Sequence, residues 1–597
     1  MTSIDYSKLV TENRIKGLWL MMRGYRWQYL VANLMQGFSA GFKILTFILL
    51  QHFVDKVIGH PELGWQVLWI ALGFIGLAAL EGFATYLSGR IAGFASEGIA
   101  QRLRDFLYDH LQHLSFTYHD KTQTGELIQR VTSDVDAVRR FFAQQAIQAG
   151  RVVLLFIIIW AVVLSLNVRL GLISVVVIPV VFGISLLFFR EIGKRYEKYQ
   201  SLEGKVSTAL QENLTGVRVV KAFNRAEYEI AKFEEKNHAH YEQGKRLLIS
   251  HALYWPITDV MIGIQQLTGY VVAGGMVIRG ELTIGTYLAY AWLMIWLLYP
   301  IRNLGRLLID MSEARVSYGR IKEILSQTRE PLDDGKYQPQ DDLRGDVRFQ
   351  QVNFQYEGEK AGVLHAIDLN VHSGQIIGLI GPTGAGKSSL VNLLLRFYDY
   401  NSGSIQLDGV ELRDYPRDYL RRQIGIVQQE PFLFSRTIRE NITYGLGRPA
   451  TDEEIYAAAR AAAVHDVILS FPDQYYTVVG ERGVTLSGGQ KQRVALARIL
   501  LKNPHILILD DTTSAVDSET EEEIRAALKT IMHNRTTFII AHRIQSVMLA
   551  DQIVVLDKGQ IVQLGKHQQL LAQPGLYRRI YEVQAQVEAE LEQELAN

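Results

Sequence analysis

The sequence predicts a multi-domain protein, in which an all-α domain with six transmembrane helices precedes an α/β domain. Long runs without charge fill much of the first half of the 597 residues. After a polar stretch near residue 327 the pattern changes to short strands, turns and amphipathic helices. In that second half an apolar strand leads into a glycine-rich turn and a helix start, "IIGLIGPTGAGKSSL". The length alone exceeds one ordinary domain.

Composition narrows the class of protein. Lys+Arg and Asp+Glu are both 62, so no global charge points toward nucleic acid. The hydrophobic share of 48% is high for a soluble protein with 21% charged residues. There is no cysteine, which excludes disulfides, thiolate zinc sites and cysteine nucleophiles. The N-terminus is mixed polar and basic and lacks the apolar core of a cleaved signal peptide.

Six segments of the first half are predicted to cross a membrane. They are approximately 29–54, 65–88, 145–166, 170–189, 260–278 and 282–301. The last three are uncharged over 20, 19 and 20 residues, close to the ~20 residues that span ~30 Å of hydrocarbon. The first three are interrupted by Lys43, Glu81 and Arg151. We take Glu81 as a candidate cavity-lining group, because ionisable groups at membrane depth usually face a bundle interior.

Loop lengths predict the topology of this domain. Short turns join segments 1–2, 3–4 and 5–6, whereas long, charged, helix-patterned stretches, about 90–140 and 190–250, join the others. The excess of Lys and Arg in the long stretches places them and both termini in the cytoplasm. Because the helical pattern continues past the apolar parts, we expect the helices to project beyond the bilayer.

The glycine-rich turn predicts a phosphate-binding site. Gly381, Gly384 and Gly386 let backbone N–H groups converge on phosphates. Lys387 supplies charge at the β- and γ-phosphates, and Ser388 offers a hydroxyl to Mg²⁺. The predicted nucleotide-binding loop comprises Gly381, Pro382, Thr383, Gly384, Ala385, Gly386, Lys387, Ser388 and Ser389.

A second buried strand, "ILILDD", ends in two carboxylates. Asp510, its last residue, is predicted to hold magnesium, and Asp511 follows at the position from which a base could reach a water. An isolated Asp at a strand end is commonly only solvated. Downstream of a phosphate-binding loop, a magnesium carboxylate is the better interpretation.

Residues 486–490, "LSGGQ", look like the signature motif of ATP-binding-cassette (ABC) ATPases, and residues 343–580 resemble that domain throughout. The resemblance implies ATP and Mg²⁺ as cofactors, with Ser388, Gln429 and Asp510 at the metal. It also implies roles for Tyr356 (stacking on adenine), His542 (γ-phosphate), the loop 478–483 (contact with the membrane domain) and the loop 514–517 (contact with a partner). In this family the signature residues Ser487, Gly488, Gly489 and Gln490 cover the ATP held by a second subunit.

The membrane half is similar to the exporters of the same family. Residues 117–138 and 210–223 resemble the cytoplasmic turns that dock on the ATPase domains as coupling helices. The chain is thus identified as a half-transporter. Its predicted parts are a transmembrane domain (1–326, coupling helices near 117–130 and 210–223), a linker (327–342), a nucleotide-binding domain (343–580) and a C-terminal helix (581–597). The tail would either stabilise a dimer or be a solvated end.

Asp511 stands where the family's general base is glutamate. Because aspartate is one methylene shorter, its oxygens fall about an ångström short of the same water, a misplacement that can cost on the order of 10²-fold in rate. We favour the impaired half of a heterodimer, since such halves recur in the family. Retained His542 and Gln429, which complete the predicted catalytic set with Asp511, keep open a homodimer in which Asp511 works.

The function expected from this resemblance is ATP-driven export by alternating access. Cargo would be hydrophobic or amphipathic (drugs, lipids or peptides), and the expected partners are a second half-transporter and membrane lipids, without nucleic acid. The expected location is a bacterial inner or plasma membrane, with the ATPase domain in the cytoplasm. The alternatives are a homodimeric lipid or drug exporter and an ATP-binding regulatory or scaffolding subunit.

Overall fold

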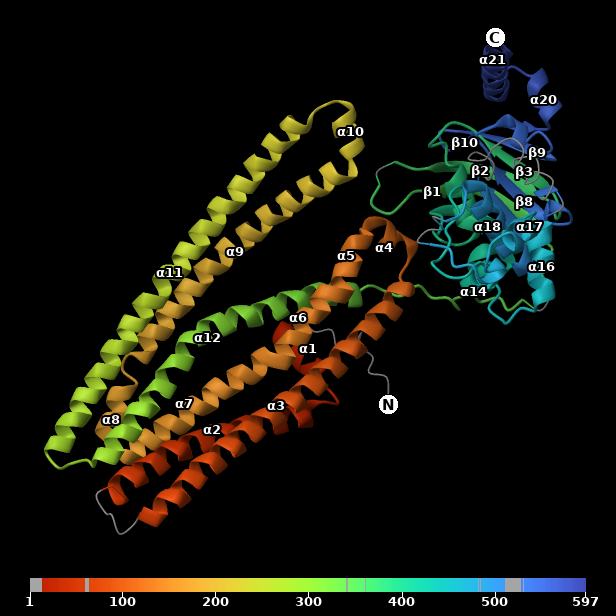
Figure 1. The fold of residues 1–597 in the computed structure, drawn as a ribbon. Helices are drawn as coiled ribbons and strands as arrows, with labels where there is room; N and C mark the ends of the chain where they lie inside the picture. The colour runs from red at the N-terminus through yellow and green to blue at the C-terminus, as the bar shows by residue number, and fades with distance from the viewer. Residues whose placement is uncertain are drawn as a thin grey trace. The chain divides into compact units, whose positions relative to one another are not determined.

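The computed structural model describes residues 13–58, 64–339, 342–359, 361–480, 483, 485–510, 528–529 and 531–596. The chain forms two compact units (Figure 1). The first comprises residues 1–113 and 122–328, and the second comprises residues 114–121 and 329–597. The short segment 114–121 therefore belongs to the second unit, although its neighbours on both sides belong to the first.

The first unit is helical. Its elements are α1 (Arg14–Met21), α2 (Arg26–Lys56), α3 (Gly64–Gln112), α5 (Thr124–Gln129), the π-helical turn η3 (Arg130–Asp134), α6 (Val135–Arg140), the π-helical turn η4 (Phe141–Gln145), α7 (Ala146–Leu166), α8 (Val168–Ser174), α9 (Ile178–Thr215), α10 (Val217–Ala222), α11 (Ala226–Ile278) and α12 (Ile284–Leu325). Figure 1 shows α10 as the short turn of helix that joins the far ends of α9 and α11.

Five helical stretches of the described chain are long and apolar enough to cross a membrane. They are Arg26–Lys56, Gly64–Gln112, Thr124–Leu166, Val168–Thr215 and Ala226–Ile278. The sixth predicted segment lies on α12, whose apolar part, Ile284–Leu298, is shorter. The 49 residues of α3 extend about 74 Å at ~1.5 Å per residue, more than twice the ~30 Å of hydrocarbon. The predicted projection beyond the bilayer is therefore confirmed for this helix.

The membrane-spanning segment predicted over 170–189 lies within the apolar stretch Val168–Thr215, but this stretch is divided between two helices. Helix α8 ends at Ser174 and α9 begins at Ile178, with Pro179 in the first turn of α9. Proline lacks a backbone N–H, and in the first turn of a helix this costs no intrahelical hydrogen bond, so Pro179 suits the start of α9. Asn167 starts α8, because its Oδ1 accepts from the N–H groups of Arg169 (3.0 Å) and Leu170 (3.2 Å).

The charges that interrupt the first two predicted spans pair with each other. Lys43 Nζ on α2 lies 3.4 Å from Glu81 Oε2 on α3. The same ammonium lies 4.9 Å from the ring centroid of Trp296 on α12. Ionisable groups at membrane depth are expensive unless they are paired. Glu81 is therefore a counter-ion that ties α3 to α2, and its expected position in a cavity wall stays a prediction.

Two sheets organise the second unit. The six-stranded sheet has the order β10-β9-β3-β8-β7-β6 and the four-stranded sheet has the order β2-β1-β4-β5. The strands are β1 (Val347–Phe354), β2 (Leu364–Val371), β3 (Ile376–Ile380), β4 (Ser402–Leu407), β5 (Val410–Glu411), β6 (Ile424–Val427), β7 (Ile506–Asp510), β8 (Thr536–Ile540), β9 (Gln552–Asp557) and β10 (Gln560–Gly565). Strands β9, β3, β8, β7 and β6 are parallel, and β7 is a continuous apolar run, as expected for a strand covered on both faces.

The second unit also contains helices. They are α4 (Phe116–Lys121), α13 (Lys387–Leu394), α14 (Arg417–Gln423), α15 (Ile438–Thr443), α16 (Asp452–Ala461), α17 (His465–Leu469), α18 (Gly488–Lys502), α20 (His567–Ala572) and α21 (Leu576–Ala596), with 3-10 turns η5 (Leu412–Asp414), η6 (Gln474–Tyr476) and η8 (Ile544–Ser546). One apolar core includes Leu379 and Leu390; another includes Ile455, Leu496 and Leu507 and joins α16 and α18 to the sheet. Helix α21 confirms that the C-terminal tail is helical.

The polar segment predicted as a linker, 327–342, is bound to the second unit over part of its length. Glu330 accepts from both terminal nitrogens of Arg421, at 2.7 and 2.6 Å. Asp334 accepts from Arg396 at 2.9 Å and also from Arg417. Arg396 is only 4% exposed, and a buried guanidinium requires such partners. Glu330 and Asp334, which belong to the segment predicted as a linker, therefore pair with arginines of the second unit.

Candidate nucleotide site and coupling segment

The sheet topology brings four separate pieces of sequence to one edge. Strands β3, β8, β7 and β6 are neighbours and parallel, so their carboxyl ends lie at the same edge. The predicted site groups that follow or end these four strands are, in that order, the Gly381–Lys387 loop, His542, Asp510 and Gln429. This edge is where ligands bind in open α/β sheets. Residues more than 150 positions apart therefore meet at one candidate site.

The glycine-rich loop has a backbone that only glycine adopts readily. Gly384 and Gly386 have φ values of +80° and +97°. A Cβ on Gly386 would lie 2.7 Å from Leu364 Cδ2, so this position also lacks space for a side chain. Gly386 is the N-cap of α13, and Lys387 is its first residue. The N–H groups that open α13 and the loop before it can therefore converge on an anion.

Lys387 is held over this loop. Its side chain is 5% exposed, and Nζ donates to the carbonyls of Gly381 (2.8 Å) and Pro382 (3.0 Å). Pro382, Thr383, Gly384 and Ser388 are exposed, whereas Gly381, Ala385, Gly386 and Ser389 are buried. The buried residues fix the shape of the loop. The exposed residues are accessible to a ligand.

Tyr356, predicted to stack on adenine, lies just beyond β1 within an aromatic cluster. Its ring meets Phe354 at 4.7 Å and Tyr398 at 5.0 Å, both edge to face. Its hydroxyl lies 2.9 Å from Ser389 Oγ on α13. The structure thus connects Tyr356 to the phosphate loop through Ser389. Stacking on adenine remains a prediction.

The segment α4 packs on this aromatic cluster. Phe116 stacks on Phe397 with ring centroids 4.0 Å apart. Tyr398 donates its hydroxyl to Asp120 Oδ2 at 2.5 Å, and Lys121 pairs with Glu357 at 3.1 Å. Burial, and then the Asp120 carboxylate, raises the pKa of Tyr398, so the phenol remains a donor. A continuous set of contacts runs from α4 through Tyr398 to the candidate nucleotide site.

The bounds of the segment around α4 differ from the sequence prediction. The predicted helix near 117–130 is two helices, α4 and α5, and only α4 belongs to the second unit. The residues that receive α4, Phe397 and Tyr398, were not predicted. The signal that could have found them is the aromatic run "FYDY" directly after the phosphate-loop helix.

The signature segment forms the start of α18. Ser487 Oγ accepts from Gln490 N at 3.3 Å, and Ser487 N donates to Gln490 Oε1 at 3.0 Å, which is a capping box. The N–H of Ser487, expected to face an anion, is therefore engaged within the helix start. The N–H groups of Gly488 and Gly489 belong to the first turn, where no intrahelical acceptor exists, so they are the donors best suited to an anion.

The C-terminal helix binds the loop that carries His542. Gln584 on α21 donates to the His542 carbonyl at 2.7 Å and accepts from Ile544 N at 2.9 Å. The His542 side chain is exposed. Helix α21 therefore supports the candidate site, a role that neither sequence interpretation of the tail included.

Several predicted site residues lie outside the described part of the chain. These are Asp511, the loop 514–517 and parts of the loop 478–483. Among the described residues no group of three or more His, Asp or Glu side chains could hold a metal by itself. The donors present fit Mg²⁺ bound jointly with phosphates, because this ion is usually held by one or two carboxylates plus phosphate oxygens. Asp510 is half-buried at its strand end, and Gln429 is exposed in a bend after β6.

Comparisons with known proteins cover nearly the whole chain. The family model for the ABC transporter transmembrane region matches residues 29–301, and the model described as ABC transporter matches residues 364–514. The chain is 38% identical over 571 residues to the uncharacterized ABC transporter ATP-binding protein YknU of Bacillus subtilis, covering 95% of this chain and 96% of that protein. It is 34% identical over 518 residues to the ATP-dependent lipid A-core flippase of Syntrophus aciditrophicus, covering 86% and 85%.

Proposed function

This chain belongs to the ABC transporter family, and we propose that it is one half of an ATP-driven exporter of hydrophobic or amphipathic molecules. The observation that carries the proposal is the meeting of the Lys387 loop, His542, Asp510 and Gln429 at one sheet edge. Membrane-crossing helices in the same chain link this ATPase domain to transport. The relative named as a lipid flippase supports amphipathic cargo for this chain too.

Each residue of the site has a proposed task. Lys387 exchanges its two loop carbonyls for the β- and γ-phosphates, which the N–H groups of the loop also bind. Ser388 and Asp510 would hold Mg²⁺, and the bound ion would supply positive charge to the transferred phosphoryl group. Gln429 and His542 orient the attacking water and the γ-phosphate. Tyr356 stacks on the adenine, and Ser389 fixes the tyrosine by its hydroxyl.

A second subunit is needed to complete the nucleotide sites. Gly488 and Gly489 at the start of α18 are proposed to bind the ATP of the partner, so two domains close over two nucleotides. ATP then favours the closed state, and hydrolysis removes that preference. Helix α4 transmits closure within this subunit. On α10 and its flanks Leu214, Val219 and Phe223 are 66%, 61% and 74% exposed, and we propose that they dock on the ATPase domain of the partner.

We further propose that the partner is a different half-transporter and that the site containing Asp511 hydrolyses slowly. The support is chemical: aspartate reaches less far than glutamate, while its basicity is similar. The signature motif is intact and can complete a competent site on a partner that carries glutamate. The second candidate is a homodimer, which retained His542 and Gln429 favour.

Transport in proteoliposomes tests export. The full-length chain, with its partner if one is needed, should accumulate an amphipathic fluorescent dye in an ATP-dependent manner. Lys387→Ala in both subunits should abolish accumulation and ATPase activity alike. ATP binding without stimulated hydrolysis, even beside a glutamate-bearing partner, would instead indicate a regulatory subunit.

Substitution of Asp511 tests the pairing. In transporter assembled only from copies of this chain, Asp511→Glu should raise the ATPase rate on the order of 10²-fold, because the longer acid regains reach. Asp511→Ala should leave the low rate nearly unchanged. Brisk hydrolysis by the unsubstituted assembly that disappears in Asp511→Ala would establish the homodimer and rule out the impaired site.

A further inference from the structure

A cavity of about 400 Å³ lies inside the first unit, away from the nucleotide site. It is lined by residues of α1, the start of α2, the π-helical turn η4, the start of α7 and the second half of α12. Its walls are mainly apolar and aromatic, including Trp19, Phe142 and Met311, with Tyr29, Asn33 and Arg315 as the main polar groups. This volume and lining fall within the range of sites that take small amphipathic ligands.

One buried donor of the cavity wall is unsatisfied. Tyr29 is 5% exposed, and its hydroxyl has no hydrogen-bond partner among the described residues. Buried polar groups are nearly always paired, because leaving one unpaired is costly. The neighbouring Asn33 is satisfied, since its Nδ2 donates to the Tyr29 carbonyl at 2.9 Å. The orphan hydroxyl therefore indicates a ligand that offers an acceptor.

A cation accompanies this donor. Arg315 lines the cavity and reaches Ser312 Oγ at 3.4 Å. Within the described part of the chain no carboxylate lies within ion-pair distance of its guanidinium. The guanidinium of an arginine in this position can bind a phosphate without first breaking an ion pair.

The depth of the cavity identifies the ligand. Tyr29 and Ala146 stand at the cytoplasmic starts of the helices that cover the predicted spans 29–54 and 145–166. Trp19 on α1 is 55% exposed, and the Arg26 guanidinium lies 5.2 Å from its ring centroid. Tryptophan and basic residues gather at the membrane interface, and the cytoplasmic leaflet is anionic. At this level a phospholipid changes from acyl chain to ester and phosphate.

We propose that this cavity binds an anionic phospholipid of the inner leaflet. An acyl chain fills the apolar part, Tyr29 donates its hydroxyl to an ester or phosphate oxygen, and Arg315 pairs with the phosphate. The lipid is a bound component that fastens α1 to α2 and α12, not cargo. This inference is independent of the proposed export, because lipid retention requires no ATP.

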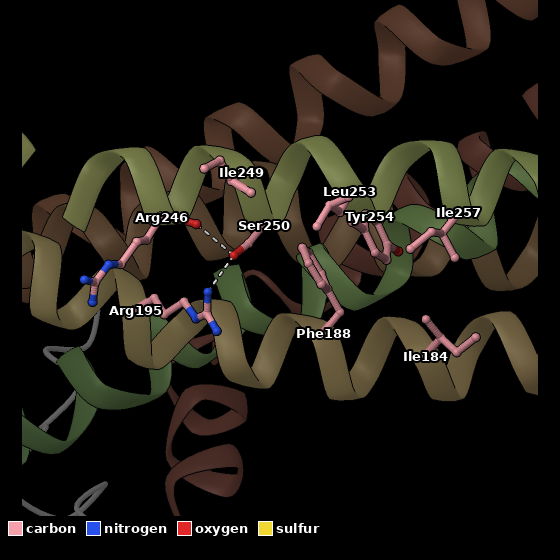
Figure 2. A pocket seen from close by; sticks show the side chains of 9 residues that line it. All are labelled: Ile184, Phe188, Arg195, Arg246, Ile249, Ser250, Leu253, Tyr254 and Ile257. Atoms are coloured by element: carbon pink, nitrogen blue, oxygen red, sulfur yellow. Dashed lines mark hydrogen bonds between the residues drawn. The ribbon is translucent and has the colours of Figure 1, made fainter. Parts of the chain in front are cut away.

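A second cavity provides the matched control. It has about 420 Å³ and lies between α9 and α11, lined by Phe188, Leu253 and Ile257 with Arg195 and Ser250 at one end (Figure 2). Two of its polar contacts are made within the protein: Arg195 donates to Ser250 Oγ at 2.8 Å, and the Tyr254 hydroxyl lies 2.7 Å from Ser185 Oγ. Arg246, which also lines this cavity, is exposed. The two cavities have nearly equal volumes, but only the first has a buried hydroxyl without a hydrogen-bond partner among the described residues. Comparing them separates the effect of the unsatisfied hydroxyl from the effect of cavity volume.

Native mass spectrometry of the full-length chain in detergent tests the proposal. Titration with dioleoyl phosphatidylglycerol should show one saturable lipid per chain, bound about fivefold more tightly than dioleoyl phosphatidylcholine. Ala146→Phe, which fills the cavity, should weaken binding at least tenfold. Tyr29→Phe should weaken it about fivefold, the effect of one hydrogen bond. Arg315→Gln should remove the preference for the anionic lipid. Ser250→Phe in the second cavity should change nothing.

A thermal measurement makes the test independent of expression defects. In delipidated protein Tyr29→Phe should raise the melting temperature, because an unsatisfied donor disappears. With phosphatidylglycerol present the order should reverse, because only the unsubstituted chain gains the hydrogen bond. Equal binding by Ala146→Phe, or a melting temperature for Tyr29→Phe that lipid never reverses, would overturn the proposal. Binding of glycerol 3-phosphate at the same affinity would show a free-phosphate site and overturn the lipid assignment.

Discussion

The two short helices α4 and α10 have six residues each and opposite surroundings. Helix α4 belongs to the second unit, where Phe116 stacks on Phe397 at 4.0 Å. Helix α10 lies at the tip of the α9–α11 pair (Figure 1). Val219 on α10 and Phe223 directly after it are 61% and 74% exposed. Apolar groups gathered on an exposed tip indicate a missing partner. The chain thus contains the acceptor for α4, and we propose that a second chain supplies the acceptor for α10.

The largest effect should come from a charge on α10's flank. Phe223→Asp should lower the ATPase rate of the assembled transporter at least about thirtyfold, since a carboxylate would be buried unpaired in the proposed interface. Gel filtration with light scattering should show fewer dimers. Phe223→Leu, which stays apolar, is the matched control. A dimeric, fully active Phe223→Asp protein would mean that α10 docks nowhere.

The corresponding change on α4 should be somewhat milder. Phe116→Ala removes a stacked pair and its apolar contact, so we expect about tenfold less cargo moved per ATP hydrolysed. Nucleotide affinity should stay within about twofold, because Phe116 does not touch the phosphate loop. The ratio of dye transport to phosphate release measures this coupling. An unchanged ratio would show that the α4 contact is only structural.

Gln584 extends the comparison to a third contact within the second unit. Gln584→Ala should lower kcat about fivefold with an unchanged KM for ATP, because the His542 loop loses two hydrogen bonds that position it. Gln584→Glu should be worse than alanine, since its carboxylate faces the His542 carbonyl. If Gln584→Ala instead raises the KM for ATP and leaves kcat unchanged, α21 contributes to nucleotide binding and does not position the His542 loop for hydrolysis.

Tyr398→Phe refines the α4 contact at the level of one bond. The ring stays and only the hydrogen bond to Asp120 is lost, so coupling should fall about threefold. Because the folded-state pKa of Tyr398 lies above its ordinary value, the donor is present at neutral pH and is lost only when pH rises past that raised value. The ratio of transport to ATPase activity should therefore not decline through deprotonation of Tyr398 between pH 7 and about pH 9.

The smallest effect belongs to the ion pair at the edge of the same contact. Lys121 and Glu357 lie 3.1 Å apart but are 51% and 76% exposed, so water screens their attraction. Lys121→Ala should change coupling less than about twofold. Increasing the salt concentration should abolish even this difference. A loss as large as that of Phe116→Ala would mean that charge, not ring stacking, holds α4.

The sequence by itself determined what depends on neighbouring residues. The glycine pattern before Lys387, the capping box from Ser487 to Gln490 and the apolar runs of the membrane helices are local, and local rules predict them. The parallel strands could also be expected to bring Lys387 and Asp510 to one edge. The break before Pro179 was not predicted, and a proline alone does not identify such a break, because Pro256 and Pro300 lie inside the continuous helices α11 and α12.

Only the tertiary structure decided which distant residues meet. The sequence did not predict that Glu81 pairs with Lys43 on a neighbouring helix. It also did not predict that Glu330, in the segment expected to be a linker, accepts a hydrogen bond from Arg421. The residues around Gln584 in the sequence do not predict its hydrogen bond to the His542 carbonyl. The residues around Phe116 do not predict that its ring stacks on Phe397. The physical reason is that the free energy of a pair depends on geometry between elements. A residue's own surroundings in the chain reveal its need for a partner, but the packing of the fold selects which one it receives.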